Sequence, residues 1–144
     1  MRFSNIILNK AIKSSADSNL AWKKEDIFSA IDEVTANGYA ILGGDVWAII
    51  KKSSSELVLT DVDPENIAVG IIKGKDGKDD VFNWYSDKKE VESWEEYVNR
   101  SKQETIEAIE SMKAEESVSK EFQDAIYYNL VFANKTEYNN LHKK

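Results

Sequence analysis

The only pair of adjacent glycines in the chain, Gly43-Gly44, precedes Asp45 inside an apolar run, YAILGGDVWAII, at residues 39–50. Glycines let a ligand approach the backbone closely, and a neighbouring carboxylate can orient it. The pattern therefore predicts either a small-ligand or enzymatic pocket, or a folding element. As a folding element, Gly43-Gly44 would form a tight turn or bulge, and Asp45 would accept hydrogen bonds from backbone amides. We favour the folding element, because no base, nucleophile or phosphate-binding loop accompanies Asp45.

The residue types that most catalytic chemistry requires are missing. The chain has no cysteine, and its single histidine, His142, lies in the polar tail, so neither thiol chemistry nor a Ser-His-Asp triad is expected. The stretch GKDGKDD at residues 74–80 lacks the distal glutamate of a calcium-binding loop and instead predicts a hairpin connection. We expect no catalytic residue, no metal and no cofactor, and predict that the protein is not an enzyme.

The charge balance is acidic, since 26 Asp and Glu against 19 Lys and Arg give a net charge of -7. This disfavours nucleic-acid binding, because phosphate neutralisation needs clustered Lys and Arg, but it suits a basic protein partner. Six glutamates in or just before a predicted helix form a candidate partner-facing surface. An ordinary solvated helix face is the plainer interpretation of the six, which are Glu92, Glu95, Glu96, Glu104, Glu107 and Glu110.

The sequence also predicts the compartment. No apolar run approaches the roughly 20 residues that a membrane helix needs, and residues 1–15 do not have the pattern of a signal peptide. We therefore expect a cytoplasmic protein that does not bind a membrane. No pattern in the sequence predicts its oligomeric state.

Hydrophobic periodicity predicts helices over residues 3–13, 24–37 and 93–115, and the last of these begins with the capping box Ser93 and Glu96. Strands are predicted over residues 39–50, 57–59, 67–72, 81–85 and 125–132, too close together for helical crossovers. The pattern is typical of the α+β class. We predict a single domain, residues 1–144, with a mostly antiparallel sheet of about 4–6 strands packed against two or three helices.

Two aromatic stretches have more than one interpretation. Trp84 and Tyr85 are either a recognition patch or packing residues, and alternation along a strand predicts one ring in the core and the other outside. We favour packing, because large aromatic side chains are commonly buried. The strand predicted over residues 125–132 leaves a further alternative, an adaptor that homodimerises through this strand.

Three stretches together resemble the Immunity protein 40 family of bacterial polymorphic-toxin systems: LAWKKEDIFSAIDEV, GYAILGGDVW and FNWYSDKKEVESWEEYVNRSKQETIEAI. The resemblance is strongest over residues 20–112. Its motif residues, which serve either the fold or partner binding, are Trp22, Gly43, Gly44, Asp45, Trp47, Asn83, Trp84, Tyr85 and Ser101.

The resemblance implies a small cytoplasmic α+β protein that binds and neutralises a cognate toxin domain and so protects the producing cell. Such a protein is not an enzyme. If the toxin is a basic nuclease, the glutamate-rich surface would face it and mimic a nucleic-acid backbone. That hypothesis predicts binding that weakens as salt concentration rises.

Overall fold

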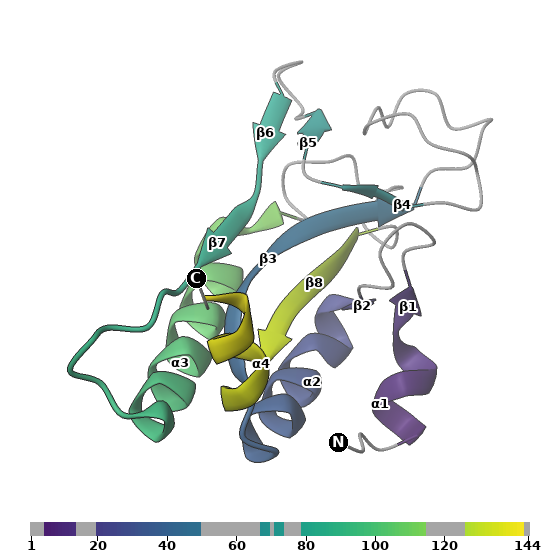
Figure 1. Cartoon of the computed structure of the whole chain (residues 1–144). Coiled ribbons are helices and arrows are strands. Elements are labelled where there is room, and N and C mark those ends of the chain that lie inside the picture. Colours follow the sequence, from purple (N-terminus) through teal and green to yellow (C-terminus); the bar gives the residue numbers. More distant parts are fainter. Residues whose placement is uncertain are drawn as a thin grey trace.

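The structure is a computed structural model that describes residues 5–13, 20–49, 67–69, 71–73, 79–114 and 126–142 (Figure 1). The helices in these ranges are α1 (Asn5–Lys10), α2 (Lys24–Ala36), α3 (Trp94–Met112) and α4 (Lys135–Leu141). The strands are β1 (Ile12–Lys13), β2 (Leu20–Trp22), β3 (Ala40–Ile49), β4 (Ile67–Val69), β5 (Ile71–Lys73), β6 (Asp79–Val81), β7 (Asn83–Tyr85) and β8 (Ile126–Ala133).

Six strands form one antiparallel sheet, in which five follow the order β1-β2-β8-β3-β4. The long strand β3 pairs with β8 along one side. On its other side it pairs with the sixth strand, β7, over Gly43 to Asp45 and then with β4 over Trp47 to Ile49. Strands β5 and β6 make a separate antiparallel pair. The segment that carries Gly43, Gly44 and Asp45 therefore lies inside the sheet, with a strand on each side.

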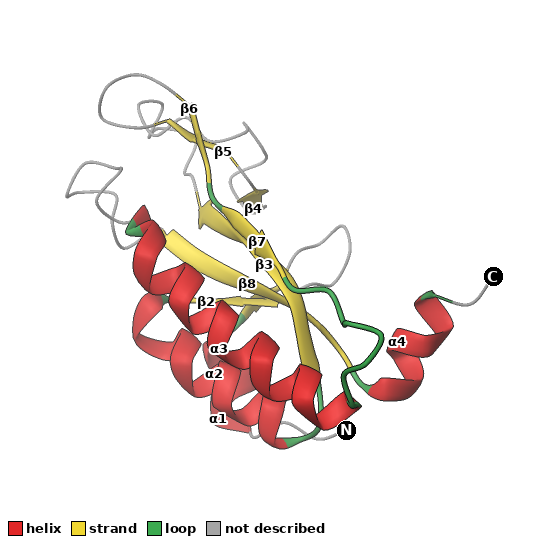
Figure 2. Cartoon of the chain, turned by 90° about the vertical axis from the view of Figure 1, so that its left-hand side faces the viewer, coloured by secondary structure: helices red, strands yellow, loops and turns green. Residues whose placement is uncertain are grey.

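Helices α1, α2 and α3 cover one face of this sheet, whereas α4 follows the end of β8, off to one side in this view, and contacts the start of α3 (Figure 2). The main core lies between this helical layer and the sheet. Its largest fully buried side chains include Trp22, Ile31, Ile41 and Tyr128. Within the described ranges, no helix is long and apolar enough to cross a membrane.

Capping boxes start both C-terminal helices. In α3, the Ser93 hydroxyl accepts a hydrogen bond from the Glu96 amide, and the Glu96 carboxylate accepts one from the Ser93 amide, at 3.1 and 2.9 Å. Asn134 and Glu137 repeat this arrangement in α4. Each box satisfies backbone amides that have no partner within the helix. Tyr138 of α4 then packs against the aromatic rings at the start of α3.

The predicted α+β class, antiparallel sheet and long helix are confirmed. Some boundaries differ. The first helix ends at Lys10, and residues 12–13 form a strand. The run predicted as one strand at residues 67–72 belongs to two, because β4 pairs with β3 and β5 pairs with β6. The polar tail forms α4, which makes four helices in the described ranges. The strand predicted at 57–59 and most of the hairpin connection at 74–80 lie outside these ranges.

Candidate functional site

A bulge lies just before the glycine pair, within one continuous strand. The register between β3 and β8 shifts between Ile41 and Gly43, so β3 holds an extra residue there. A Cβ atom on Gly43 would lie 2.3 Å from the Trp84 carbonyl oxygen, and one on Gly44 would lie 2.1 Å from the Asn129 carbonyl oxygen. Both contacts are shorter than real Cβ atoms make. The two glycines are therefore required by the close approach of β7 and β8.

Two motif side chains fasten α3 to this part of the sheet. The Trp84 indole nitrogen donates a buried hydrogen bond of 3.1 Å to the Thr105 hydroxyl. The Ser101 hydroxyl accepts one of 3.0 Å from the Ile41 amide, next to the bulge, and donates one to the Val98 carbonyl. The bulge leaves backbone groups that a regular ladder would pair, and Ser101 satisfies one of them.

The remaining tryptophans of the motif are also inside the protein. Trp22 belongs to the main core and is fully buried, and Trp47 is 2% exposed. Neither side chain can contact a partner without unfolding of its surroundings. Of the nine motif residues, those with accessible side chains are Asp45, Asn83 and Tyr85.

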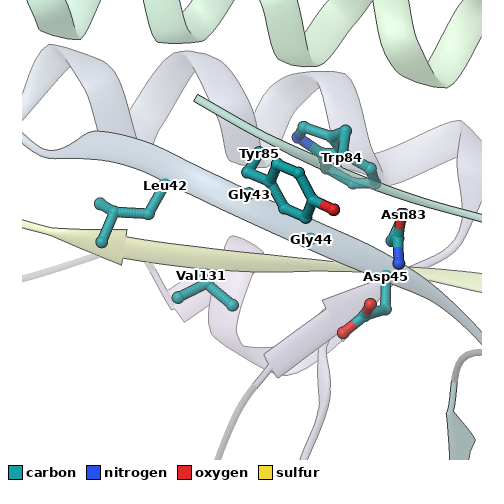
Figure 3. Close-up of a pocket in the computed structure, with 8 residues that line it drawn as sticks. All are labelled: Leu42, Gly43, Gly44, Asp45, Asn83, Trp84, Tyr85 and Val131. Atoms are coloured by element: carbon teal, nitrogen blue, oxygen red, sulfur yellow. The ribbon is translucent and has the colours of Figure 1, made fainter. Parts of the chain in front are cut away.

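These three side chains line a hollow of about 210 Å³ that is wide open to solvent, together with Leu42 and Val131 (Figure 3). In the pairing of β3 with β7, Tyr85 is opposite Gly43 and Asn83 is opposite Asp45. Side chains two residues apart on a strand share a face. Trp84 points into the core, and Tyr85 points outward and is 78% exposed. The alternation predicted for this aromatic pair is therefore observed.

Asp45 is a half-buried carboxylate, and burial raises its pKa above the ordinary value of 3.8. Within the described residues, no hydrogen bond or ion pair involves its side chain. The sequence-based interpretation that Asp45 holds backbone amides is therefore not supported by its contacts. In the GGD stretch, Gly43 and Gly44 allow the neighbouring strands to approach closely, whereas the Asp45 side chain faces the hollow.

The six candidate glutamates divide into two groups. Glu92 and Glu104 bind Arg100, whose guanidinium donates to their carboxylates at 2.6 to 2.8 Å and to the Asp87 carbonyl at 2.5 Å. Hydrogen bonding to Arg100 lowers the pKa of Glu92 to about 2. Glu96 is used as the cap of α3. The other three, Glu95, Glu107 and Glu110, are exposed, and the described residues give them no ion pair.

The sequence analysis missed Arg100 as an organising residue and Leu42 and Val131 as lining residues. Arg100 follows Glu96 and precedes Glu104 by four residues each, a spacing that places opposite charges side by side on a helix and could have marked it. Val131 alternates with buried residues of β8, so its outward direction follows from strand periodicity. Its proximity to Tyr85 depends on the pairing order of the strands, which no local pattern contains.

The described residues contain no group of three or more side chains that could hold a metal ion. Fold and site together define a small antiparallel α+β protein whose accessible features suit the binding of a partner. Comparison with known families is more specific. The model of the Immunity protein 40 family matches residues 10–132, and the chain belongs to that family. No match was found among curated proteins or solved structures.

Proposed function

We propose that the protein binds and neutralises a cognate toxin domain of a bacterial polymorphic-toxin system, and that it does so in the cytoplasm of the cell that produces the toxin. The observation that carries this proposal is the family match over residues 10–132. The protein acts by occupying the toxin and not by catalysis. The lining of the hollow supports this mode of action, because among the described residues Asp45 is its only carboxylate and no histidine, lysine or arginine lines it.

The charge of the chain supports a basic toxin. With a net charge of -7 and the exposed carboxylates Glu95, Glu107 and Glu110 along α3, the protein attracts a positively charged domain over long distances. Association is therefore faster at low ionic strength. A toxin that cleaves nucleic acid would present such a basic surface, and the acidic helix would guide its approach.

Co-expression tests this function. The gene beside this one should encode a protein with a toxin domain. We expect that domain to stop growth when produced alone and to permit growth when co-produced with this protein, with which it should co-purify. The matched control is the Gly44→Ala variant, which has the same charge but a destabilised fold and should protect less well. Continued growth arrest in the presence of folded wild-type protein would contradict the proposal.

A second candidate function is the binding of a small ligand at the hollow, and the raised pKa of Asp45 favours it. The size and shape of the hollow count against it. At about 210 Å³ and wide open, the hollow is smaller than the roughly 300–1,000 Å³ of typical ligand pockets. Thermal-shift screening against metabolites would favour this alternative if one compound stabilised the wild type and not Asp45→Asn.

A homodimeric adaptor built on the edge of β8 is disfavoured by the sheet order. Tyr128 to Leu130 pair with β2 on one side of this strand, and its residues from Ile126 to Ala133 pair with β3 on the other. A second copy therefore finds no continuous free edge along β8.

A further inference from the structure

The hollow between β3, β7 and β8 contains the Asp45 carboxylate and the Tyr85 ring. Among the described residues, no group pairs with this carboxylate or stacks on this ring. Asp45 is half-buried and has no counter-charge among the described residues, and Tyr85 is 78% exposed. Exposed tyrosines at the centre of a small apolar rim are characteristic of binding hot spots. Leu42 and Val131, which is 38% exposed, supply that rim.

We propose that this hollow receives an arginine side chain of a basic protein partner, with its guanidinium paired to Asp45 and stacked on Tyr85. The proposal rests on the toxin-binding function proposed above, in which that partner is the toxin domain. The contact with this arginine gives the pair of proteins its specificity.

The register of the strands places the two groups at a suitable separation. Tyr85 is opposite Gly43, two residues before Asp45, so the ring and the carboxylate are diagonal neighbours on one face. Diagonal pairs in an antiparallel ladder lie about 7–8 Å apart, within the span of one long side chain. Figure 3 shows the Tyr85 ring above the Gly43-Gly44 backbone, with its hydroxyl directed toward Asn83 and Asp45. Gly43 has no side chain that would cover the ring, and Tyr85 is 78% exposed.

The chemistry of the hollow favours arginine over lysine. A guanidinium is planar, stacks on aromatic faces and binds a carboxylate with two parallel hydrogen bonds, whereas an ammonium ion is a strongly hydrated point charge. The Asn83 side-chain carbonyl can accept a further N–H, and Leu42 and Val131 can cover the methylene stem. The half-buried carboxylate at the centre repels phosphate, so a nucleic-acid ligand does not fit.

The charge of the protein also favours a cationic side chain as the occupant of the hollow. The chain carries a net charge of -7, and the desolvated Asp45 lacks a cation among the described residues. A partner cation would remove the cost of leaving this charge half-buried, and such a contact mainly slows dissociation. The exposed glutamates of α3, by contrast, speed encounter without fixing the orientation.

The first test needs no toxin. Backbone amide NMR shifts are followed while blocked arginine, N-acetyl-arginine methylamide, is titrated into the folded protein, and blocked lysine is the matched probe. We expect arginine to shift the amides of Gly43 to Asp45 and Asn83 to Tyr85 more than lysine does, and Asp45→Asn to abolish the difference. Equal shifts with both probes, or no shift at these residues, would overturn the proposal whether or not the toxin function holds.

The second test measures affinity and dissociation rate with the toxin domain from the co-expression experiment. We expect Asp45→Asn and Tyr85→Ala each to weaken binding about thirtyfold through faster dissociation. Tyr85→Phe keeps the ring, and Glu25→Gln removes an exposed carboxylate on α2, so both should bind like the wild type. If the wild type neutralises the toxin and all four variants bind equally well, the arginine site is wrong while the immunity function stands.

Discussion

Two acidic regions of this protein differ in what their carboxylates are used for. On α3 and the segment before it, Glu92 and Glu104 are held by one guanidinium, that of Arg100. In the hollow, Asp45 has no such partner among the described residues, and burial raises its pKa. A cluster of acids in the sequence can thus be internally neutralised, while a single acid beside two glycines keeps its charge available for another molecule.

The packing beside the bulge supports both regions, so Gly44→Ala should destabilise the protein more than Arg100→Met or Asp45→Asn does. Its Cβ would lie 2.1 Å from the Asn129 carbonyl and 2.5 Å from the Trp84 ring. We expect a loss of about 3 kcal/mol in the free energy of unfolding, because an overpacked core must shift backbone. Urea denaturation followed by tryptophan fluorescence measures it.

Gly38→Ala is the matched control. Gly38 has a positive φ of 82° but nothing within 4 Å of an added Cβ, so only backbone strain of about 1 kcal/mol is expected. Equal losses in the two variants would mean that the contacts around Gly44 do not constrain the fold.

Arg100→Met tests whether the acidic region of α3 is held together from within. The variant removes the donor to Glu92, Glu104 and the Asp87 carbonyl, and we expect a loss of about 1–2 kcal/mol. Lys102→Met is the control, because the ion pair of Lys102 with Asp32, whose side chain is 67% exposed, should contribute less than about 0.5 kcal/mol.

The pH dependence of stability provides a second test of the pair between Arg100 and Glu92. The pKa of Glu92 is lowered from 4.5 to about 2 in the folded protein, so the stability it contributes is present above pH 4.5 and is lost as pH falls toward 2. Arg100→Met should flatten the stability profile over this window. A profile identical to that of the wild type would show that the pair is not formed in solution.

The two regions also differ in how much of their structure could be predicted from the sequence. Ser93 and Glu96 predicted their capping box, and hydrophobic periodicity over residues 93–115 predicted α3, because both depend on residues three or four apart. A pocket at Gly43-Gly44-Asp45 was one of two alternatives that the sequence offered, but the full lining of the hollow could not be predicted. Its residues come from three strands, and their meeting depends on β7 and β8 pairing with opposite sides of β3.

The role of Asp45 illustrates the same limit. Proximity to Gly43 and Gly44 in sequence suggested that the acid shares their structural task. The register shift places the glycines against neighbouring backbone and leaves the Asp45 side chain facing the hollow. The burial of Asp45, and the lack of a counter-charge for it among the described residues, are properties of the folded surroundings, so local sequence does not contain them.

A smaller effect is expected from neutralising the unpaired glutamates of α3. The triple variant Glu95→Gln, Glu107→Gln, Glu110→Gln should lower the association rate with a basic toxin domain a few-fold at low salt and leave the dissociation rate unchanged. Stopped-flow association at two ionic strengths measures it. A change confined to the dissociation rate would place these residues in the interface and contradict the division between the two regions.

The smallest expected effect is the change in stability of Asp45→Asn. The sign of this change distinguishes a folding role for Asp45 from a partner-binding role. Burial raises the folded-state pKa above 3.8, so between the two pKa values the folded protein keeps a proton that the unfolded chain has released. The free energy of unfolding of the wild type therefore falls as pH rises through this window and stays lower above it. Asp45→Asn lacks this titration and should be more stable at neutral pH by less than about 1 kcal/mol.

Chemical denaturation at pH 3 and pH 7 measures this difference between Asp45→Asn and the wild type. Glu25→Gln, which replaces an exposed carboxylate on α2, is the control for the loss of one charge. A clear loss of stability in Asp45→Asn would mean that the carboxylate holds the bulge after all, as a folding element would. Retained stability together with faster release of the toxin would mean that the fold carries this half-buried charge for the partner.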